Sequence, residues 1–161
     1  EVHPRPIQQP HPPIWVAAFG PKALAQAGRL GLPYLSSPME SLATLEQNYA
    51  QHRLSADEEG VAKPVEVPLM RTVFVSKDGQ QTAKLRQLML QQSENSRLSE
   101  GETLDDWTII GEPSYVRDRV DEYRQRLGMT HLIATRIRVS GLDEVELRGS
   151  VALLAETLNG L

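Results

Sequence analysis

The chain has 161 residues, of which 40% are hydrophobic and 24% charged, with 17 Lys and Arg against 21 Asp and Glu. This length suits one domain that folds without a disulfide or metal, and the absence of Cys excludes a disulfide framework, a thiolate zinc site, an iron–sulfur cluster and a cysteine nucleophile. The net charge of -4 argues against a nucleic-acid-binding protein. No apolar run approaches the ~20 residues that span a membrane. No signal-peptide pattern is present either, so we expect no membrane partner and a cytoplasmic location.

Prolines crowd the start of the chain. Five of the 11 prolines lie in the first 13 residues, and the chain does not begin with Met. Proline removes a backbone donor and disfavours helix at the residue before it, so residues 1–13 are predicted to be a non-helical lead-in. A chain that opens inside such a connection looks cut from a longer protein, and we expect residues 1–161 to be a fragment.

The first half of the chain predicts two strands, each followed by a helix. The apolar run 14–18 predicts a buried strand, and a Gly-Pro pair then opens a helix over 21–30. Residues 32–35 predict the second strand. The segment Ser37-Pro38-Met39-Glu40 is typical of a capping box with Ser37 at the cap. The inner face of the helix that it opens would carry Met39, Leu42, Leu45 and Tyr49.

The middle of the chain contains two polar connections around a strand and a helix. Residues 54–66 are predicted to be a loop, and residues 68–76 a third strand. Asp78 can cap a helix that runs to about residue 92. Residues 93–108 are polar and acidic and are long for a connection in a compact domain. They are therefore either a disordered linker or a mobile loop that covers a site.

The last third predicts a helix, a strand and a final helix. Pro113 opens a helix that extends to Leu127, and residues 131–139 predict the fourth strand. Asp143 and Glu146 then mark the start of a last helix. Its inner face would carry Leu147, Val151, Leu154 and Leu158.

The order of these elements, strand then helix four times, predicts an α/β fold with a parallel sheet. The strands are continuously apolar, as expected when both faces of the sheet are covered. Four parallel strands leave two bare edges, which tend to find partners. The chain is therefore either a small open sheet or half of a (β/α)8 barrel that another segment or a second copy completes. We expect a homo-oligomer.

An ordered set of segments resembles the luciferase-like flavin-dependent monooxygenases. The segment His3–Trp15 is similar to the lead into the fifth strand of that family, and Ile110–Val116 to its Gly-Thr-Pro turn. The next helix and the sixth, seventh and eighth strands are matched by residues 20–31, 32–35, 70–75 and 127–141. The resemblance covers nearly the whole chain, but only the C-terminal half of a family member. It implies half of a TIM (β/α)8 barrel, with strands five to eight and their helices.

The resemblance also implies a chemistry in which the cofactor does the difficult work. Family members use reduced FMN and O2 to oxygenate a small organic substrate, and one branch uses the deazaflavin F420 instead. Three interpretations follow: a fragment of an FMN-dependent monooxygenase, a fragment of an F420-dependent oxidoreductase, or a catalytically inactive half-barrel that self-associates. The missing N-terminal half-barrel or a second copy is the expected protein partner.

The best candidate for a cofactor site is the turn that follows the first strand. Barrel active sites lie at the carboxyl ends of strands, and a helix N-terminus suits a phosphate. Gly20 permits a close backbone approach and Lys22 adds a positive charge. In the resembled family the flavin phosphate contacts this turn, where small or hydroxylic residues are common. Ala18 and Phe19 depart from that pattern, so their contact would be through the backbone. The alternative is that the turn merely starts a helix.

Other polar residues near strand ends have simpler explanations. Ser36 is a candidate to line the pocket, whereas Ser37 is more readily explained as the helix cap. Arg136 and Arg138 share one face of the last strand and would either form structural ion pairs or reach an anion. Arg71, near the start of a strand, is predicted to be structural. The four histidines lack metal-ligand spacing, so we expect no metal site.

Overall fold

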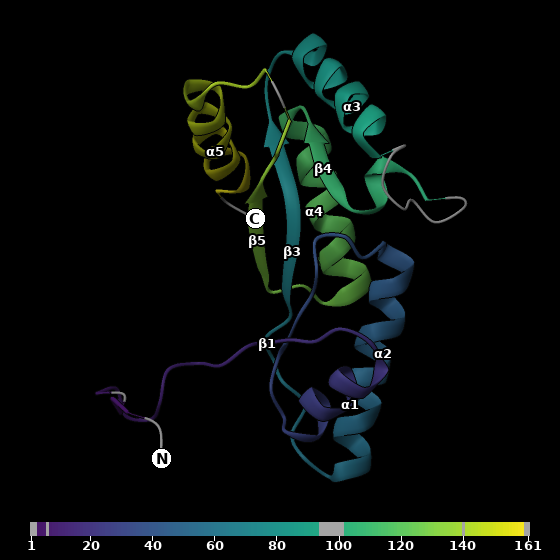
Figure 1. Cartoon of the computed structure of the whole chain (residues 1–161), viewed down its shortest axis with the longest axis vertical. Helices are drawn as coiled ribbons and strands as arrows, with labels where there is room; N and C mark the ends of the chain where they lie inside the picture. Colours follow the sequence, from purple (N-terminus) through teal and green to yellow (C-terminus); the bar gives the residue numbers. More distant parts are fainter. Residues whose placement is uncertain (1–2, 6, 94–101, 140, 160–161) are drawn as a thin grey trace.

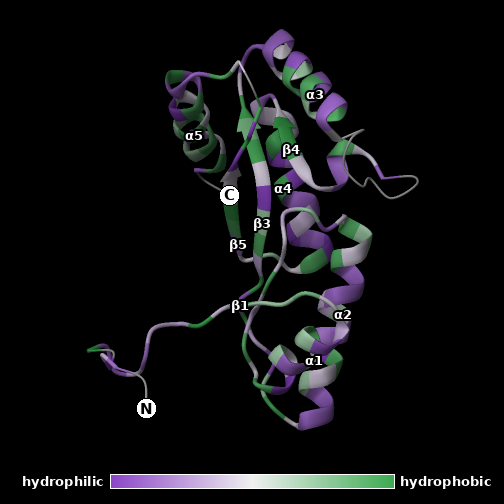
Figure 2. Cartoon of the chain, viewed as in Figure 1, coloured by the Kyte–Doolittle hydropathy of each residue, from purple (hydrophilic) through white to green (hydrophobic). Residues whose placement is uncertain are grey.

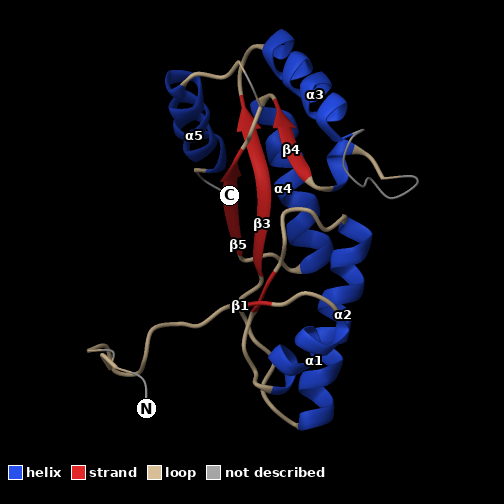
Figure 3. Cartoon of the chain, viewed as in Figure 1, coloured by secondary structure: helices blue, strands red, loops and turns tan. Residues whose placement is uncertain are grey.

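A computed structural model of the chain describes residues 3–5, 7–93, 102–139 and 141–159. Helices and strands alternate along most of it (Figure 3). The elements are β1 (Val16–Ala17), α1 (Pro21–Arg29), β2 (Tyr34–Leu35), α2 (Leu42–Glu59), β3 (Pro68–Val75), α3 (Gly79–Ser93), the 3-10 helix η1 (Leu104–Asp106), β4 (Thr108–Gly111), α4 (Pro113–Leu127), β5 (His131–Arg136) and α5 (Glu144–Leu158). Among the described residues, no helix is both long and apolar enough to cross a membrane.

The strands form two parallel sheets. One contains β1 and β2, and the other has the order β4-β3-β5, with β3 in the centre (Figure 1). The predicted α/β class with parallel strands is confirmed. The prediction missed β4, because its short run Thr108–Gly111 follows a polar stretch and directly precedes a proline.

The position of β4 explains why the strands do not form one row. The upper part of β3, Thr72–Val75, pairs with β4. Lower down, the Met70 N–H donates to the Ser36 hydroxyl (3.2 Å), and β5 pairs with the other edge of β3. The end of β2 and strand β4 therefore lie along the same edge of β3. The contact of β2 with that edge is the Ser36 side chain, not a ladder of backbone hydrogen bonds.

The strands have one face packed against helices and one face that is more open. The packed face contacts α1, α2, α4 and α5, and Figure 2 shows that β3, β4 and β5 are mostly hydrophobic. Successive side chains along each strand point alternately to the packed face and to the opposite face, here called the inner face. It consists of Ala17, Leu35, Met70, Thr72, Ile133 and Thr135. None of these six side chains is fully buried, although Phe74 and Ile110 are buried against Leu85 and Trp107 near the carboxyl end of β3.

The start of α2 differs from the sequence prediction. The cap is Ser41, whose hydroxyl accepts from the Thr44 N–H (3.2 Å), and the helix begins at Leu42. The predicted box still forms in part, since the Glu40 carboxylate accepts from the Ser37 N–H (2.6 Å), but it closes a turn before the helix. Met39 lies in that turn and is 61% exposed, so its assignment to the inner face of the helix was wrong.

The end of α2 also differs, because the helix continues to Glu59 through part of the predicted loop 54–66. Ser55 and Ala56 are buried, which gives this polar stretch a packed face that its composition does not reveal. The helix ends at Gly60, whose left-handed φ of 73° suits glycine.

The later helix boundaries follow the prediction closely. Asp78 accepts from the Gln80 and Gln81 N–H groups at 2.9 and 3.2 Å, and Asp143 forms a reciprocal capping box with Glu146. Val151, however, is 67% exposed rather than buried. Val151 lines the space between β5 and α5 and is less buried than its place in the apolar pattern predicts.

Only part of the predicted mobile segment 93–108 can be compared with the structure. Residues 94–101 lie outside the described residues. From Thr103 onward the chain forms η1 and the start of β4 rather than an irregular connection, and Trp107 is buried in the core. This tryptophan fixes the end of the segment to the inner side of the sheet.

Candidate functional site

The predicted cofactor turn lies between β1 and α1, at the carboxyl end of β1. Ala18 is buried with its side chain in the core on the packed face, whereas Phe19 is 73% exposed. Gly20 has φ 79°, and no atom would meet a Cβ placed there within 4 Å. Lys22 is exposed on the first turn of α1. The turn is thus open to a ligand and presents a positive charge.

The N-terminus of α1 is not capped by any side chain. The Leu24 N–H donates to the Gly20 carbonyl (3.2 Å), and Pro21 has no N–H to satisfy. The N–H groups of Lys22 and Ala23 consequently have no carbonyl within the helix. The first turn also holds no acidic residue. Free N–H groups, the helix dipole and a lysine together fit the phosphate of a flavin nucleotide.

Ser36 lies beside this turn in the fold but uses its hydroxyl internally. The residue is buried, and its hydroxyl accepts from the Met70 N–H across to β3. Nearby, the Tyr49 hydroxyl donates to the Pro68 carbonyl (2.9 Å), and burial raises the pKa of this phenol, so it remains a donor at neutral pH. These bonds hold β2 against β3 and thereby fix the position of one strand along the other.

Toward the carboxyl ends of β3 and β5, the inner face is apolar apart from one pair of hydroxyls. Thr72 and Thr135 are register partners on β3 and β5, and their hydroxyl oxygens lie 3.2 Å apart. Met70 and Ile133 occupy the same face one step earlier along the two strands. A surface of this kind excludes water from a planar ring and offers few polar groups to it.

Arg136 and Arg138 were expected either to form structural ion pairs or to reach an anion, and within the described part of the chain neither forms an ion pair. Both side chains are exposed, and Arg136 lines a cavity between β5 and α5 together with Ala134. Alternation along β5 puts them on the side that faces the helices. They are therefore directed away from the inner face. In the described ranges there is also no group of three His, Asp or Glu side chains that would hold a metal ion.

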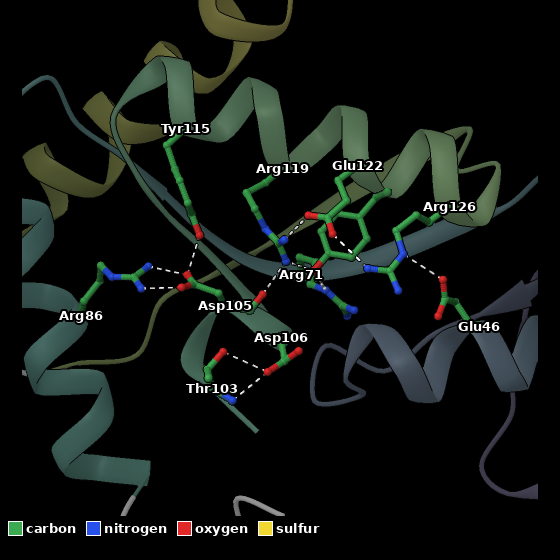
Figure 4. Close-up of polar contacts among 11 residues, drawn as sticks. Glu46, Arg71, Arg86, Thr103, Asp105, Asp106, Tyr115, Arg119, Glu122 and Arg126 are labelled. Carbon is green, nitrogen blue, oxygen red and sulfur yellow. Dashed lines mark hydrogen bonds and ion pairs between the residues drawn. The ribbon is translucent and has the colours of Figure 1, made fainter. Parts of the chain in front are cut away.

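A polar cluster near η1 was not predicted. The Asp105 carboxylate accepts two bonds from Arg86 (2.6 and 2.7 Å) and one from the Tyr115 hydroxyl (2.5 Å), as Figure 4 shows. Arg119 donates to the Asp105 carbonyl (2.5 Å). We call these four residues the Asp105 cluster. It joins α3, η1 and α4, and the only sequence signal for it was an acidic pair next to a turn.

Charge pairing sets the ionisation of the Asp105 cluster. Hydrogen bonding from Arg86 holds the pKa of the Asp105 carboxyl below its usual range. Burial, reinforced by Asp105, raises the pKa of Tyr115 to about 12. The cluster therefore carries a carboxylate and a protonated phenol at neutral pH. Both groups can keep their hydrogen bonds, which suits a structural role.

Arg71 is the one fully buried arginine among the described residues. Figure 4 shows its side chain beside α4. Its guanidinium donates to the Tyr123 hydroxyl and the Glu40 and Met70 carbonyls (all 2.9 Å), and to the Ser37 carbonyl (3.3 Å). It thus ties β3 to α4 and to the turn before α2, which agrees with the structural role predicted for it.

Comparison with known proteins identifies a related family. The family model described as luciferase-like monooxygenase matches residues 1–131. No protein in the curated set matches the chain.

Solved structures resemble the chain over about half of their own length. The monooxygenase RslO1 from Streptomyces bottropensis is 22% identical, with a TM-score of 0.71, and the match covers 98% of this chain and 50% of that one. The oxygenating constituent of 3,6-diketocamphane monooxygenase from Pseudomonas putida, solved with FMN, is 15% identical with a TM-score of 0.67 (91% and 48% covered). The coenzyme F420-dependent tetrahydromethanopterin reductase from Methanopyrus kandleri is 15% identical with a TM-score of 0.58 (91% and 49% covered). The parallel α/β arrangement is half of a TIM barrel, as predicted.

Proposed function

Because this chain belongs to the luciferase-like monooxygenase family, we propose that it supplies half of a flavin-dependent monooxygenase site. The whole enzyme would use reduced FMN and O2 to oxygenate a small organic substrate. The observation that carries the proposal is the uncapped N-terminus of α1, with Gly20 and Lys22, at the carboxyl end of β1 and beside an apolar inner face. A phosphate anchor next to a dry surface is what a flavin nucleotide needs.

Each residue of the candidate site has a distinct task in this proposal. The N–H groups of Lys22 and Ala23 and the Lys22 ammonium hold the phosphate, and Gly20 leaves space for it. Ala18 and Phe19 contribute through their backbone, and Ser36 positions the end of β2 through its bond to β3. When bound, the flavin supplies the activation of O2. The inner face orients the ring and excludes water from it.

The chain provides only part of this site, since it spans about half the length of the solved structures that it matches. The remaining wall would come from a complementary half-barrel or from a second copy. Binding of FMN by the isolated chain should therefore be weak. A catalytically inactive half-barrel is the outcome if no second half associates.

The deazaflavin F420 is the second candidate cofactor. The likeness to an F420-dependent reductase, at a TM-score of 0.58, supports it. F420 also carries a phosphate, so the same turn would anchor it, but the reaction would then be hydride transfer rather than oxygenation. Parallel titrations with FMN and F420 separate the two candidates by which one binds more tightly.

The test is a fluorescence titration of the chain with FMN, for the wild type, for Lys22→Ala and for the matched exposed lysine variant Lys84→Ala. We expect Lys22→Ala to weaken binding about fivefold, since one exposed charge contact contributes about 1 kcal/mol. Lys84 lies on α3, so its variant should bind like the wild type.

Equal affinities for the two lysine variants would contradict the proposed phosphate site. Micromolar FMN binding with flavin-dependent O2 consumption by a monomeric chain would contradict the requirement for a second half. The titration therefore tests the phosphate site, and the oxygen uptake tests whether the chain needs a second half.

A further inference from the structure

Two threonine hydroxyls lie side by side on the inner face. Thr72 on β3 and Thr135 on β5 are register partners, and their hydroxyl oxygens are 3.2 Å apart. A hydroxyl carries one hydrogen and acceptor lone pairs. One of these hydroxyls donates to the other, so the second keeps a hydrogen that has no acceptor among the described residues. The pair therefore offers both a hydrogen-bond donor and free lone pairs to a ligand on this face.

A third threonine in the same row has no hydrogen to offer. Thr108 on β4 is the other register partner of Thr72. It is fully buried, and its hydroxyl donates to the Leu104 carbonyl of η1 (2.8 Å). Thr72 and Thr135 are only half-buried. The part of the row that a ligand can reach is therefore the pair on β3 and β5.

The strand register puts this pair at the level of the proposed phosphate site. Ala18 follows β1 and lies level with Ser36 on β2, because the preceding residues of the two strands are register partners. The Ser36 hydroxyl in turn accepts from the Met70 N–H on β3. Two residues farther along, β1 leads to Gly20 and β3 to Thr72. The phosphate site and the threonine pair are therefore at similar heights on the carboxyl side of the strands.

The span between the two sites suits a flavin nucleotide. Thr72 is two strands away from β1 and Thr135 is three, and neighbouring strands lie about 4.8 Å apart, so the span is on the order of 10–15 Å. An extended ribityl chain and the width of the flavin ring together cover a distance of this order. One end of the ring is an apolar dimethylbenzene, and the other is a pyrimidine whose imide has an N–H between two carbonyls. A donor beside an acceptor matches the imide end.

We propose that Thr72 and Thr135 bind the pyrimidine imide of the flavin ring. The free hydroxyl hydrogen donates to a ring carbonyl, and a hydroxyl oxygen accepts from the imide N–H. These bonds direct the polar end of the ring toward β3 and β5 and so determine which way round the ring lies on the inner face. The inference rests on the proposed function, because it concerns the same bound cofactor.

The test is a fluorescence titration with FMN and with N3-methyl-FMN, which lacks the imide N–H. Valine has the shape of threonine without the hydroxyl, so the double variant Thr72→Val/Thr135→Val should bind FMN about tenfold more weakly than the wild type. The wild type should bind FMN at least about fivefold more tightly than N3-methyl-FMN, since the methyl group removes one of the bonds. The double variant should discriminate between the two ligands by less than about twofold, because it lacks the acceptor for that N–H.

The matched control is Thr108→Val, which changes the same residue type in the same row. Its hydroxyl is already used within the fold, so this variant should keep the wild-type FMN affinity and the preference over N3-methyl-FMN. Circular dichroism should show that all the variants are folded. A loss of affinity in Thr108→Val equal to that in the double variant would overturn the inference.

The Lys22→Ala variant separates a failure of this inference from a failure of the proposed function. If Lys22→Ala weakens FMN binding but the double threonine variant binds both ligands as the wild type does, the phosphate site stands and the assignment of the ring is wrong. An equal loss for both ligands in the double variant would also overturn the assignment, because the imide N–H would then play no part. No FMN binding by the wild type would contradict both proposals.

Discussion

Gly28 lies where α1 crosses α2 at close range. A Cβ at this position would stand 2.3 Å from the His52 carbonyl oxygen and 3.0 Å from the Ser55 Cβ. Both obstacles belong to a helix whose backbone cannot move alone, and His52 is itself held by a bond to the Leu32 carbonyl (2.9 Å). We predict that Gly28→Ala lowers the free energy of unfolding by about 2 kcal/mol through overpacking, measured by urea denaturation.

Gly149 provides the matched control, because it also lies inside a helix but has no atom within 4 Å of a Cβ. Gly149→Ala should raise the stability by about 0.5–1 kcal/mol through helix propensity. The two substitutions should thus have opposite signs. If both variants were stabilised, the close approach of α1 and α2 would be wrong.

Residue-level predictions from sequence succeeded where the cause is local. The Asp143–Glu146 box and the Asp78 cap depend on neighbours within one turn, so spacing alone identifies them. The hydrogen-bond partner of Ser36 depends instead on which edge of β3 lies beside β2. The surroundings of the Arg136 side chain depend on where α5 packs. Those are tertiary facts, which a periodicity over one short strand does not contain.

At the scale of elements, the Asp105 cluster clamps η1 between α3 and α4. Because Arg86 lowers the pKa of Asp105 in the folded chain, the cluster's contribution is complete above the unfolded pKa of about 3.9 and is lost as the pH falls through the folded value. We predict that Asp105→Asn lowers stability by roughly 1 kcal/mol at neutral pH, since both partners are partly exposed, and flattens the acid loss below about pH 4.

The measurement is urea denaturation from pH 7 down to pH 3, with Asp121→Asn as the control. Asp121 forms a surface pair with Arg124 at 3.4 Å on one helix, a contact that contributes little. The control should therefore retain the wild-type pH profile. An Asp105→Asn profile that runs parallel to the wild type would show that this carboxylate is not the source of the acid sensitivity.

Element existence was predicted well for long apolar strands and poorly for β4. The run Thr108–Gly111 is short, and its strand character comes from pairing with Thr72–Val75 rather than from its own pattern. The extension of α2 to Glu59 likewise depends on burial against α1, which the polar sequence conceals.

At the scale of the whole molecule, Arg71 makes two of the polar contacts that join the larger sheet to the elements around β2. It connects β3 to the turn before α2 through Ser37 and Glu40, and to α4 through Tyr123. Replacement by leucine would remove the donors to partly buried carbonyls and to the buried Tyr123 hydroxyl, and a lost hydrogen bond of this kind costs about 1–3 kcal/mol. We predict that Arg71→Leu lowers the free energy of unfolding by about 3 kcal/mol and that Arg71→Lys, which lacks the planar fork, has an intermediate effect.

The elements that are destabilised in Arg71→Leu show whether Arg71 connects two layers or stabilises the whole chain evenly. If Arg71 joins two layers, hydrogen exchange in Arg71→Leu should accelerate more in α1 and α2 than in β3 and β5, because the three-stranded sheet also packs in a separate cluster around Phe74 and Ile110 that contains no residue of α1 or α2. The surface variant Arg124→Leu should leave both regions unchanged. Uniform acceleration over all four elements would instead mean that the chain opens as one cooperative unit, in which β1 and β2 are bound to the larger sheet by their shared hydrophobic core.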